Sequence, residues 1–137
     1  MIQLPDQQIK TLLDNAKTIA VVGLSTKQER PSNMVADYLI RSGYRVVPVN
    51  PGQREILGLH CYPDLAAVPL KIDIVDIFRK PEDVPPIVQQ AIEIGVKAVW
   101  MQQGIVHDDA AQRARDAGLI AIMDRCIKVD HAFLSRQ

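Results

Sequence analysis

The sequence predicts a doubly wound α/β fold, in which a single Rossmann-like parallel sheet of five strands carries helices on both faces. Five short apolar runs rich in β-branched residues recur along the chain, and helical patterns that each end at a glycine separate most of them. Runs that are apolar throughout are typical of strands buried on both faces of a parallel sheet. With right-handed crossovers, we expect the strand order 3-2-1-4-5. The predicted strands are residues 18–22, 45–49, 72–77 and 96–101, with a weaker fifth at 119–123.

Length and charge limit the classes of function. The 137 residues, 47% of them apolar, suffice for one globular domain over residues 1–137 and are too few for two. Sixteen basic and sixteen acidic residues cancel, so we expect neither nucleic acid nor a membrane as a partner. The N-terminal segment is too polar for a signal sequence, and no apolar stretch reaches the ~18 residues of a membrane span. A cytoplasmic location is therefore expected.

Each predicted helix has apolar residues on one face and a recognisable end. The first lies before residue 17 and is expected to pack outside the sheet. The second follows the first strand and stops at Gly43, the third runs from about residue 81 to Gly95, and the fourth spans residues 108–117. The apolar faces of the first two helices consist of Ile9, Leu12, Leu13 and Ala16, and of Val35, Ala36, Leu39 and Ile40.

The connection between the second and third strands, residues 50–71, differs from the others. Prolines and glycines interrupt it too often for a long helix. We expect a loop here, with at most a short turn at residues 64–68.

The most informative segment is the loop from Gly23 to Ser32, which follows the first strand and leads into a helix. A strand that ends in glycine and feeds a helix brings unpaired N–H groups and a positive dipole end together, which favours an anion. The dinucleotide pattern G-x-G-x-x-G is absent, because Ser25 and Gln28 stand where its other glycines would be. Neither the acidic residue of an NAD site, expected at the end of the second strand, nor a nucleoside triphosphate loop is present. The loop therefore predicts a phosphate-bearing ligand other than ordinary NAD or ATP.

Positive charge follows three of the four strands whose loops can reach the ligand edge of such a sheet. These cations are Lys27, Arg30, Arg54, Arg79 and Lys80. The alternative interpretation is that lysine and arginine are common in loops and that nearby glutamates dilute their effect.

The helix that follows the first strand differs from the next two strand-following helices in its first turn. One of these opens with Glu82 and Asp83 and the other with Asp108 and Asp109, whereas this helix opens with Ser32 and Asn33. Acids in a first turn satisfy the helix dipole and repel a ligand anion, so this helix is the one free for phosphate. Ser32 could also act as a simple helix cap, and the two roles are compatible.

One ordered set of motifs extends along most of the chain. It consists of Val21-Val22-Gly23-Leu24-Ser25, Arg30-Pro31-Ser32, Gly43-Tyr44-Arg45-Val46-Val47-Pro48-Val49-Asn50-Pro51, Val75-Asp76-Ile77-Phe78-Arg79, Ala98-Val99-Trp100-Met101-Gln102, Gly104 and Met123-Asp124-Arg125-Cys126. This set resembles the small stand-alone CoA-binding proteins, whose fold is similar to the N-terminal domain of the succinyl-CoA synthetase α subunit. The resemblance spans about residues 15–128.

This resemblance implies that coenzyme A or an acyl-CoA binds at the carboxyl edge of the sheet. Phosphates would be held by Gly23, Leu24, Ser25, Arg30 and Ser32. Asn50 and Pro51 would line the nucleotide pocket, Phe78, Arg79, Lys80 and Val84 would flank adenine or pantetheine, and Gln103 and Gly104 would form the far wall.

The chain departs from the synthetases in two places. They tend to carry Pro-Gly-Lys after the second strand, where this chain has Pro51-Gly52-Gln53, so Arg54 is the candidate substitute. The synthetase domain that carries the phosphorylated histidine has no counterpart here, so the resemblance does not imply ligase chemistry. We expect a non-catalytic binding or regulatory module, with a protein partner as a possible source of chemistry.

Catalysis is the alternative. His107 lies just beyond the fourth strand and could serve as a general base in a small enzyme acting on a nucleotide-bearing or CoA-thioester substrate. His60 and His131 are expected to be surface or packing residues. Asp76 and the pair Asp124-Arg125 are expected to form internal ion pairs or hydrogen-bonded anchors. Cys61 and Cys126 are expected to be free thiols, and no metal site is predicted.

Overall fold

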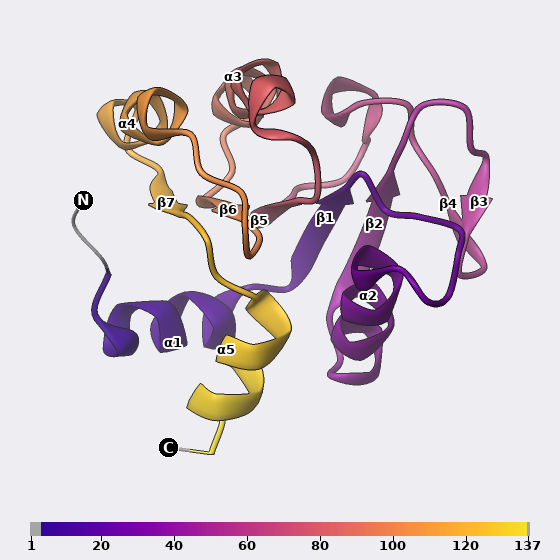
Figure 1. The fold of residues 1–137 in the computed structure, drawn as a ribbon, viewed down its shortest axis with the longest axis horizontal. Helices are drawn as coiled ribbons and strands as arrows, with labels where there is room; N and C mark the ends of the chain where they lie inside the picture. The colour runs from indigo at the N-terminus through magenta and orange to yellow at the C-terminus, as the bar shows by residue number, and fades with distance from the viewer. Residues whose placement is uncertain (1–3, 137) are drawn as a thin grey trace.

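The computed structural model describes residues 4–136 and confirms the predicted fold class, a Rossmann-like parallel sheet of five strands between helices. Helices α3 and α4 cover one face of the sheet, and α1, α2 and α5 cover the other (Figure 1). The strands are β1 (Thr18–Val22), β2 (Arg45–Val49), β5 (Ile74–Ile77), β6 (Ala98–Met101) and β7 (Ile120–Ile122). The helices are α1 (Asp6–Asn15), α2 (Pro31–Arg41), α3 (Val84–Ile94), α4 (Asp108–Asp116) and α5 (Ile127–Leu134).

The strands lie in the order β2-β1-β5-β6-β7. The position outside β2 is taken by Tyr62, which forms a parallel bridge with Val49. Its backbone accepts a hydrogen bond from Asn50 N–H at 2.9 Å and donates one to Pro48 O at 3.0 Å. With this bridge counted as a rudimentary third strand, the sheet follows the predicted pattern 3-2-1-4-5, and β7 extends it by one strand. The run at residues 72–77, which we expected outside β2, forms β5 and pairs with β1 instead.

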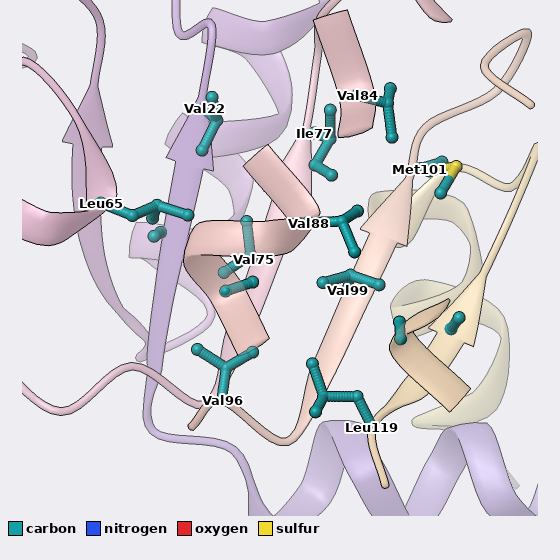
Figure 2. Packing of buried hydrophobic residues seen from close by; sticks show 14 of the residues in the cluster. Val22, Leu65, Val75, Ile77, Val84, Val88, Val96, Val99, Met101 and Leu119 are labelled. Carbon is teal, nitrogen blue, oxygen red and sulfur yellow. The ribbon is translucent and has the colours of Figure 1, made fainter. Parts of the chain in front are cut away.

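The sheet is buried on both faces, as continuous apolar runs predict. On one face Val75 and Val99, from neighbouring strands, pack beside Val88 of α3 (Figure 2). On the other face Trp100 lies fully buried in a second cluster, which includes residues of α1, α2 and α5. No helix within residues 4–136 is long and apolar enough to cross a membrane.

The connection from β2 to β5 contains three short elements. These are the hairpin strands β3 (Glu55–Ile56) and β4 (Leu59–His60), and the 3-10 helix η1 (Leu65–Ala67). The turn predicted at residues 64–68 is confirmed, because Asp64 caps η1 by accepting a hydrogen bond from Ala67 N–H at 2.9 Å. The hairpin was not predicted. Its turn uses Leu57 and Gly58, both at positive φ, and Leu57 is not a residue that signals such a turn.

The four predicted helices form close to their expected bounds, and Gly95 ends α3 in the left-handed conformation. The predicted third helix begins as a short 3-10 helix, η2 (Pro81–Asp83), before α3. Helix α5 was not predicted. Cys61 and Cys126 are both free thiols, and burial raises the pKa of Cys61.

Candidate functional site

The crossovers run in opposite directions from β1 to β2 and from β2 to β5, so the loops that follow β1 and β5 meet at the carboxyl edge of the sheet. Gly23 ends β1 with φ +88°, and its N–H donates to Val49 O at 2.9 Å. A Cβ atom at position 23 would lie 2.4 Å from the carbonyl oxygen of Phe78. Only glycine lets the two loops approach this closely.

The loop between β1 and α2 is held in shape by three side chains. Ser32 Oγ accepts a hydrogen bond from Ser25 N–H at 2.9 Å, and Asn33 Nδ2 donates to Ser25 O at 2.8 Å. Asn50 Nδ2, from the end of β2, donates to Leu24 O at 2.8 Å. The predicted residues Leu24, Ser25, Ser32 and Asn50 are therefore brought into one network.

This network gives Ser25 and Ser32 partners within the loop. Helix α2 begins at Pro31 with Arg30 as its cap residue, so the alternative of Ser32 as the helix cap is wrong. The Ser32 hydroxyl instead accepts the hydrogen bond from Ser25 N–H, and the expected contacts of the two serines with phosphate stay a prediction. Asn33, which is buried and completes the network, was not among the predicted site residues. Its position in a first helical turn gave no signal that its amide reaches back to Ser25.

No acidic side chain opposes an anion at the start of α2. Its first turn contains no acid and Arg30 lies exposed beside it, but Pro31 offers no N–H and Asn33 N–H donates to Arg30 O at 3.1 Å. By contrast, Asp108 and Asp109 lie in the first turn of α4. Two further acids, Glu82 and Asp83, lie in η2, directly before α3. The positive dipole end of α2 is thus not neutralised by acids of its own first turn.

A cavity of about 240 Å³ opens beside the loops, on the face covered by α3. Its walls are mostly apolar, with four polar side chains among them. Arg79, which follows β5, is one of these, and its Nη2 lies 3.4 Å from Asp83 Oδ2. Gln90 of α3 accepts a hydrogen bond from Leu65 N–H at 3.2 Å. The lining residues are Val22, Val49, Pro51, Pro63, Asp64, Leu65, Arg79, Asp83, Pro86, Ile87 and Gln90.

The cavity brings together only part of the predicted set. Pro51 and Arg79 line it, whereas Val84 is fully buried in the core and its side chain cannot flank a ligand. Its place as the first residue of α3 turns it toward the sheet. Leu24 is also fully buried, so only its backbone can face a ligand. Phe78 is half-buried against the opposite core, and Lys80 is exposed.

The loop after β6 is tied to the segment that precedes α5. Gly104, at φ +87°, donates its N–H to Asp124 Oδ1 at 2.6 Å, and Gln103 is exposed. Arg125 forms a two-pronged ion pair with Asp130, at 2.7 and 3.0 Å. The expected anchoring of Asp124 and Arg125 is thus confirmed.

Asp76 lies in a different environment from the one expected. Asp76 is fully buried between Val21 and Trp100 of the neighbouring strands, and neither carboxyl oxygen has a hydrogen-bond partner within residues 4–136. The prediction of an ion pair or anchor for Asp76 is therefore wrong, and burial raises its pKa well above the usual range.

His107 has a structural role in the fold. It caps α4, because its Nδ1 accepts a hydrogen bond from Ala110 N–H at 3.1 Å.

A second, larger groove of about 810 Å³ lies at the opposite, amino edge of the sheet. It is lined by residues at the ends of α1 and α2, among them Asp14 and Gly43, and by His131 of α5. Helices end there, and the negative end of a helix dipole disfavours an anion. Lys17 and Arg45 also line this groove, so its charge is mixed and only the helix ends favour the carboxyl edge for a phosphate-bearing ligand.

A family model described as a CoA binding domain matches residues 17–132, which is most of the chain. The chain belongs to the CoA-binding domain family. The match includes every predicted site residue, from Gly23 to Gly104, and all five strands of the sheet.

Relatives of this CoA-binding domain occur alone and within longer enzymes. The uncharacterized protein YneT of Bacillus subtilis is 41% identical over 125 residues, covering 91% of this chain and 93% of YneT. A solved structure of a hypothetical protein from Pyrococcus horikoshii has a TM-score of 0.94 at 43% identity, covering 96% of this chain and 93% of that one. The ADP-forming acetate–CoA ligase I of Archaeoglobus fulgidus is 34% identical over 121 residues, which cover 81% of this chain and 18% of the ligase.

Proposed function

We propose that this CoA-binding domain binds coenzyme A or an acyl-CoA at the carboxyl edge of its sheet, as a non-catalytic binding or regulatory module. Membership of the family supports the ligand class. The observation that carries the placement is the start of α2, whose acid-free first turn and exposed Arg30 lie beside the loop that ends β1. A helix start of this kind suits the phosphates of CoA.

The cavity beside Arg79 is suited to an uncharged part of the ligand. Its volume of about 240 Å³ is below the usual size of a whole ligand pocket, roughly 300–1,000 Å³, so it would hold one moiety and not all of CoA. Apolar walls with Gln90 and two carboxylates favour adenine or the pantetheine arm over phosphate. Pro51 would line this moiety, Asn50 would hold the adjoining loop at Leu24, and Gln103 with Gly104 would bound the edge beyond β6.

Binding without turnover is supported by what His107 does in the fold. Its Nδ1 lone pair caps α4, so this nitrogen is not available to take a proton from a substrate while the cap is formed. The acetate–CoA ligases match this chain over only a small share of their length. A separate protein partner would supply any chemistry on the bound thioester.

The ligand is tested by isothermal titration calorimetry and thermal-shift measurement with CoA, acetyl-CoA, NAD, NADP and ATP. We expect CoA or acetyl-CoA to bind and to stabilise the fold, and NAD to do neither. Stabilisation by NAD without stabilisation by CoA would contradict the proposal. Hydrolysis of acetyl-CoA that disappears in His107→Ala would contradict its non-catalytic part.

A further inference from the structure

Residues 124–127, which link β7 to α5, are joined by hydrogen bonds to residues 100–105 at the carboxyl end of β6. We call this contact the C-terminal junction. The bonds run from Gly104 N–H to Asp124 Oδ1 (2.6 Å), from Asp124 N–H to Ile105 O (3.2 Å), from Trp100 Nε1 to Arg125 O (2.8 Å) and from Ile127 N–H to Gln102 Oε1 (3.0 Å).

Buried side chains of β6 and of the residue after it hold the backbone of residues 125–127 in place. Trp100 is fully buried and Gln102 nearly so, and each uses its side chain to hold the backbone of residues 125–127. The side chain of Arg125 is fixed by its two hydrogen bonds to Asp130 of α5. Asp124 therefore projects from a segment that is fastened to the core.

Asp124 itself adopts a conformation that few residues other than glycine tolerate. Its φ is +57°, and within residues 4–136 only Leu57 shares this feature among the non-glycine residues. Aspartate and asparagine tolerate this left-handed region better than most side chains. Strain of this kind persists where surrounding contacts impose it, and it concentrates at functional sites.

The contact that Asp124 makes lies at the proposed ligand edge. Its side chain is exposed, and its carboxylate accepts the hydrogen bond from Gly104 N–H. An exposed carboxylate contributes little to the stability of the core. This one fixes the position of the loop that carries Gln103 and Gly104. The loop also starts beside β5, because Gln102 N–H donates to Ile77 O at 3.3 Å.

We propose that Asp124 is a positioning residue for the CoA site, which holds Gly104 so that the loop after β6 is shaped before the ligand arrives. This inference rests on the proposed function. Preorganising a loop strengthens binding because less ordering remains for the ligand to impose. The expected signature is a loss of CoA affinity with little change in the stability of the fold.

Two substitutions separate the carboxylate from the backbone conformation. Asp124→Gly keeps the left-handed conformation and removes the acceptor, whereas Asp124→Asn keeps both the conformation and an acceptor oxygen. We expect Asp124→Gly to bind CoA about three- to tenfold more weakly than the wild type, the range for the loss of one hydrogen bond of typical net strength. Asp124→Asn should retain most of the affinity.

The measurements are calorimetric titration with CoA, hydrogen exchange of the Gly104 amide, and thermal melts of each protein. In Asp124→Gly we expect the Gly104 amide to exchange its hydrogen faster than in the wild type, and the melting temperature to stay unchanged. Wild-type affinity in Asp124→Gly, or its unfolding, would overturn the inference while leaving the proposed function in place. A wild-type protein that does not bind CoA would overturn the proposed function and this role with it.

Discussion

Gly23 is the residue that allows the loops after β1 and β5 to touch. Its positive φ and the 2.4 Å separation between a Cβ at this position and Phe78 O are two separate obstacles to any side chain. The sequence predicted a phosphate-binding turn at this glycine from its place between a strand and a helix. The contact with Phe78 could not be predicted, because it depends on β5 lying next to β1.

Gly23→Ala is expected to lower the free energy of unfolding by more than about 2 kcal/mol and to abolish CoA binding, since strain and a backbone clash act together. Chemical denaturation and CoA titration check this. Gly118→Ala is the matched control, because Gly118 has φ +90° with no atom within 4 Å of the added Cβ. A similar loss of stability in both variants would show that the clash with Phe78 contributes nothing.

Asp76 is a buried carboxyl whose protonation should be linked to stability. Its folded-state pKa is raised by burial, so the unfolded chain gives up this proton at a lower pH than the folded protein. The contribution of Asp76 to the free energy of unfolding is therefore most favourable below its unfolded pKa, about 3.9. This contribution is lost as pH rises toward the folded pKa.

Asp76→Asn removes this titration while keeping the size of the side chain. The free energy of unfolding of the wild type relative to Asp76→Asn should therefore fall by about 1.4 kcal/mol for each pH unit above about pH 4, until the folded pKa is reached. Urea denaturation from about pH 3 to about pH 8 measures it, and other titrating groups cancel because both proteins share them. A difference that stays constant with pH would contradict the assignment of a raised pKa.

At the scale of elements, the start of α2 is the feature on which the proposed phosphate binding depends. The sequence predicted this helix and its acid-free first turn, because both follow from residue types and their spacing. It did not predict that Ser32 would occupy Ser25 N–H, since that contact depends on how the loop folds back on the helix.

Arg30→Ala should weaken CoA binding by about 1–3 kcal/mol if Arg30 contacts a phosphate, and leave the thermal stability unchanged. Calorimetric titration measures the affinity. Arg41→Ala, at the other end of the same helix, is the control and should bind as the wild type does. Equal affinities in all three proteins would move the phosphate site away from α2.

The link from β5 to α3 holds Arg79 against Asp83, with both side chains partly exposed. Asp83→Asn should free Arg79 for an anionic ligand and remove a negative charge, tightening CoA binding about two- to fivefold, the range of an exposed ion pair. Asp37→Asn breaks the comparable pair with Arg41 on α2 and should leave the affinity unchanged. Weaker binding by Asp83→Asn would mean that the pair supports the bound state.

Helix α5 shows why short elements escape sequence-based prediction. Ile127 and Leu134 face the core, but Val129 and Phe133 are 60% and 57% exposed, so its apolar residues do not mark one face. The hairpin of β3 and β4 was missed for a related reason, because its strands have only two residues each. Both elements are defined by their contacts with the rest of the fold.

At the scale of the whole molecule, composition and periodicity predicted the class of fold but not the place of every strand. Buried apolar runs with helical crossovers do not say which run lies beside which in the sheet. The connection after β2 decides this, because its Tyr62 takes the outer edge of that strand with a single bridge. The run at residues 72–77 is therefore placed next to β1, which brings Arg79 close to Gly23.

The two edges of the sheet carry different ends of the helices, and comparing the edges gives the most direct test of the proposed CoA site. The measurement is chemical-shift mapping of backbone amides by NMR during titration with CoA. We predict saturable shifts at Gly23, Leu24 and Asn50, and none at Gly43 or His131 in the groove at the amino edge. Shifts confined to that groove, or no saturable shift at either edge, would contradict the proposed site.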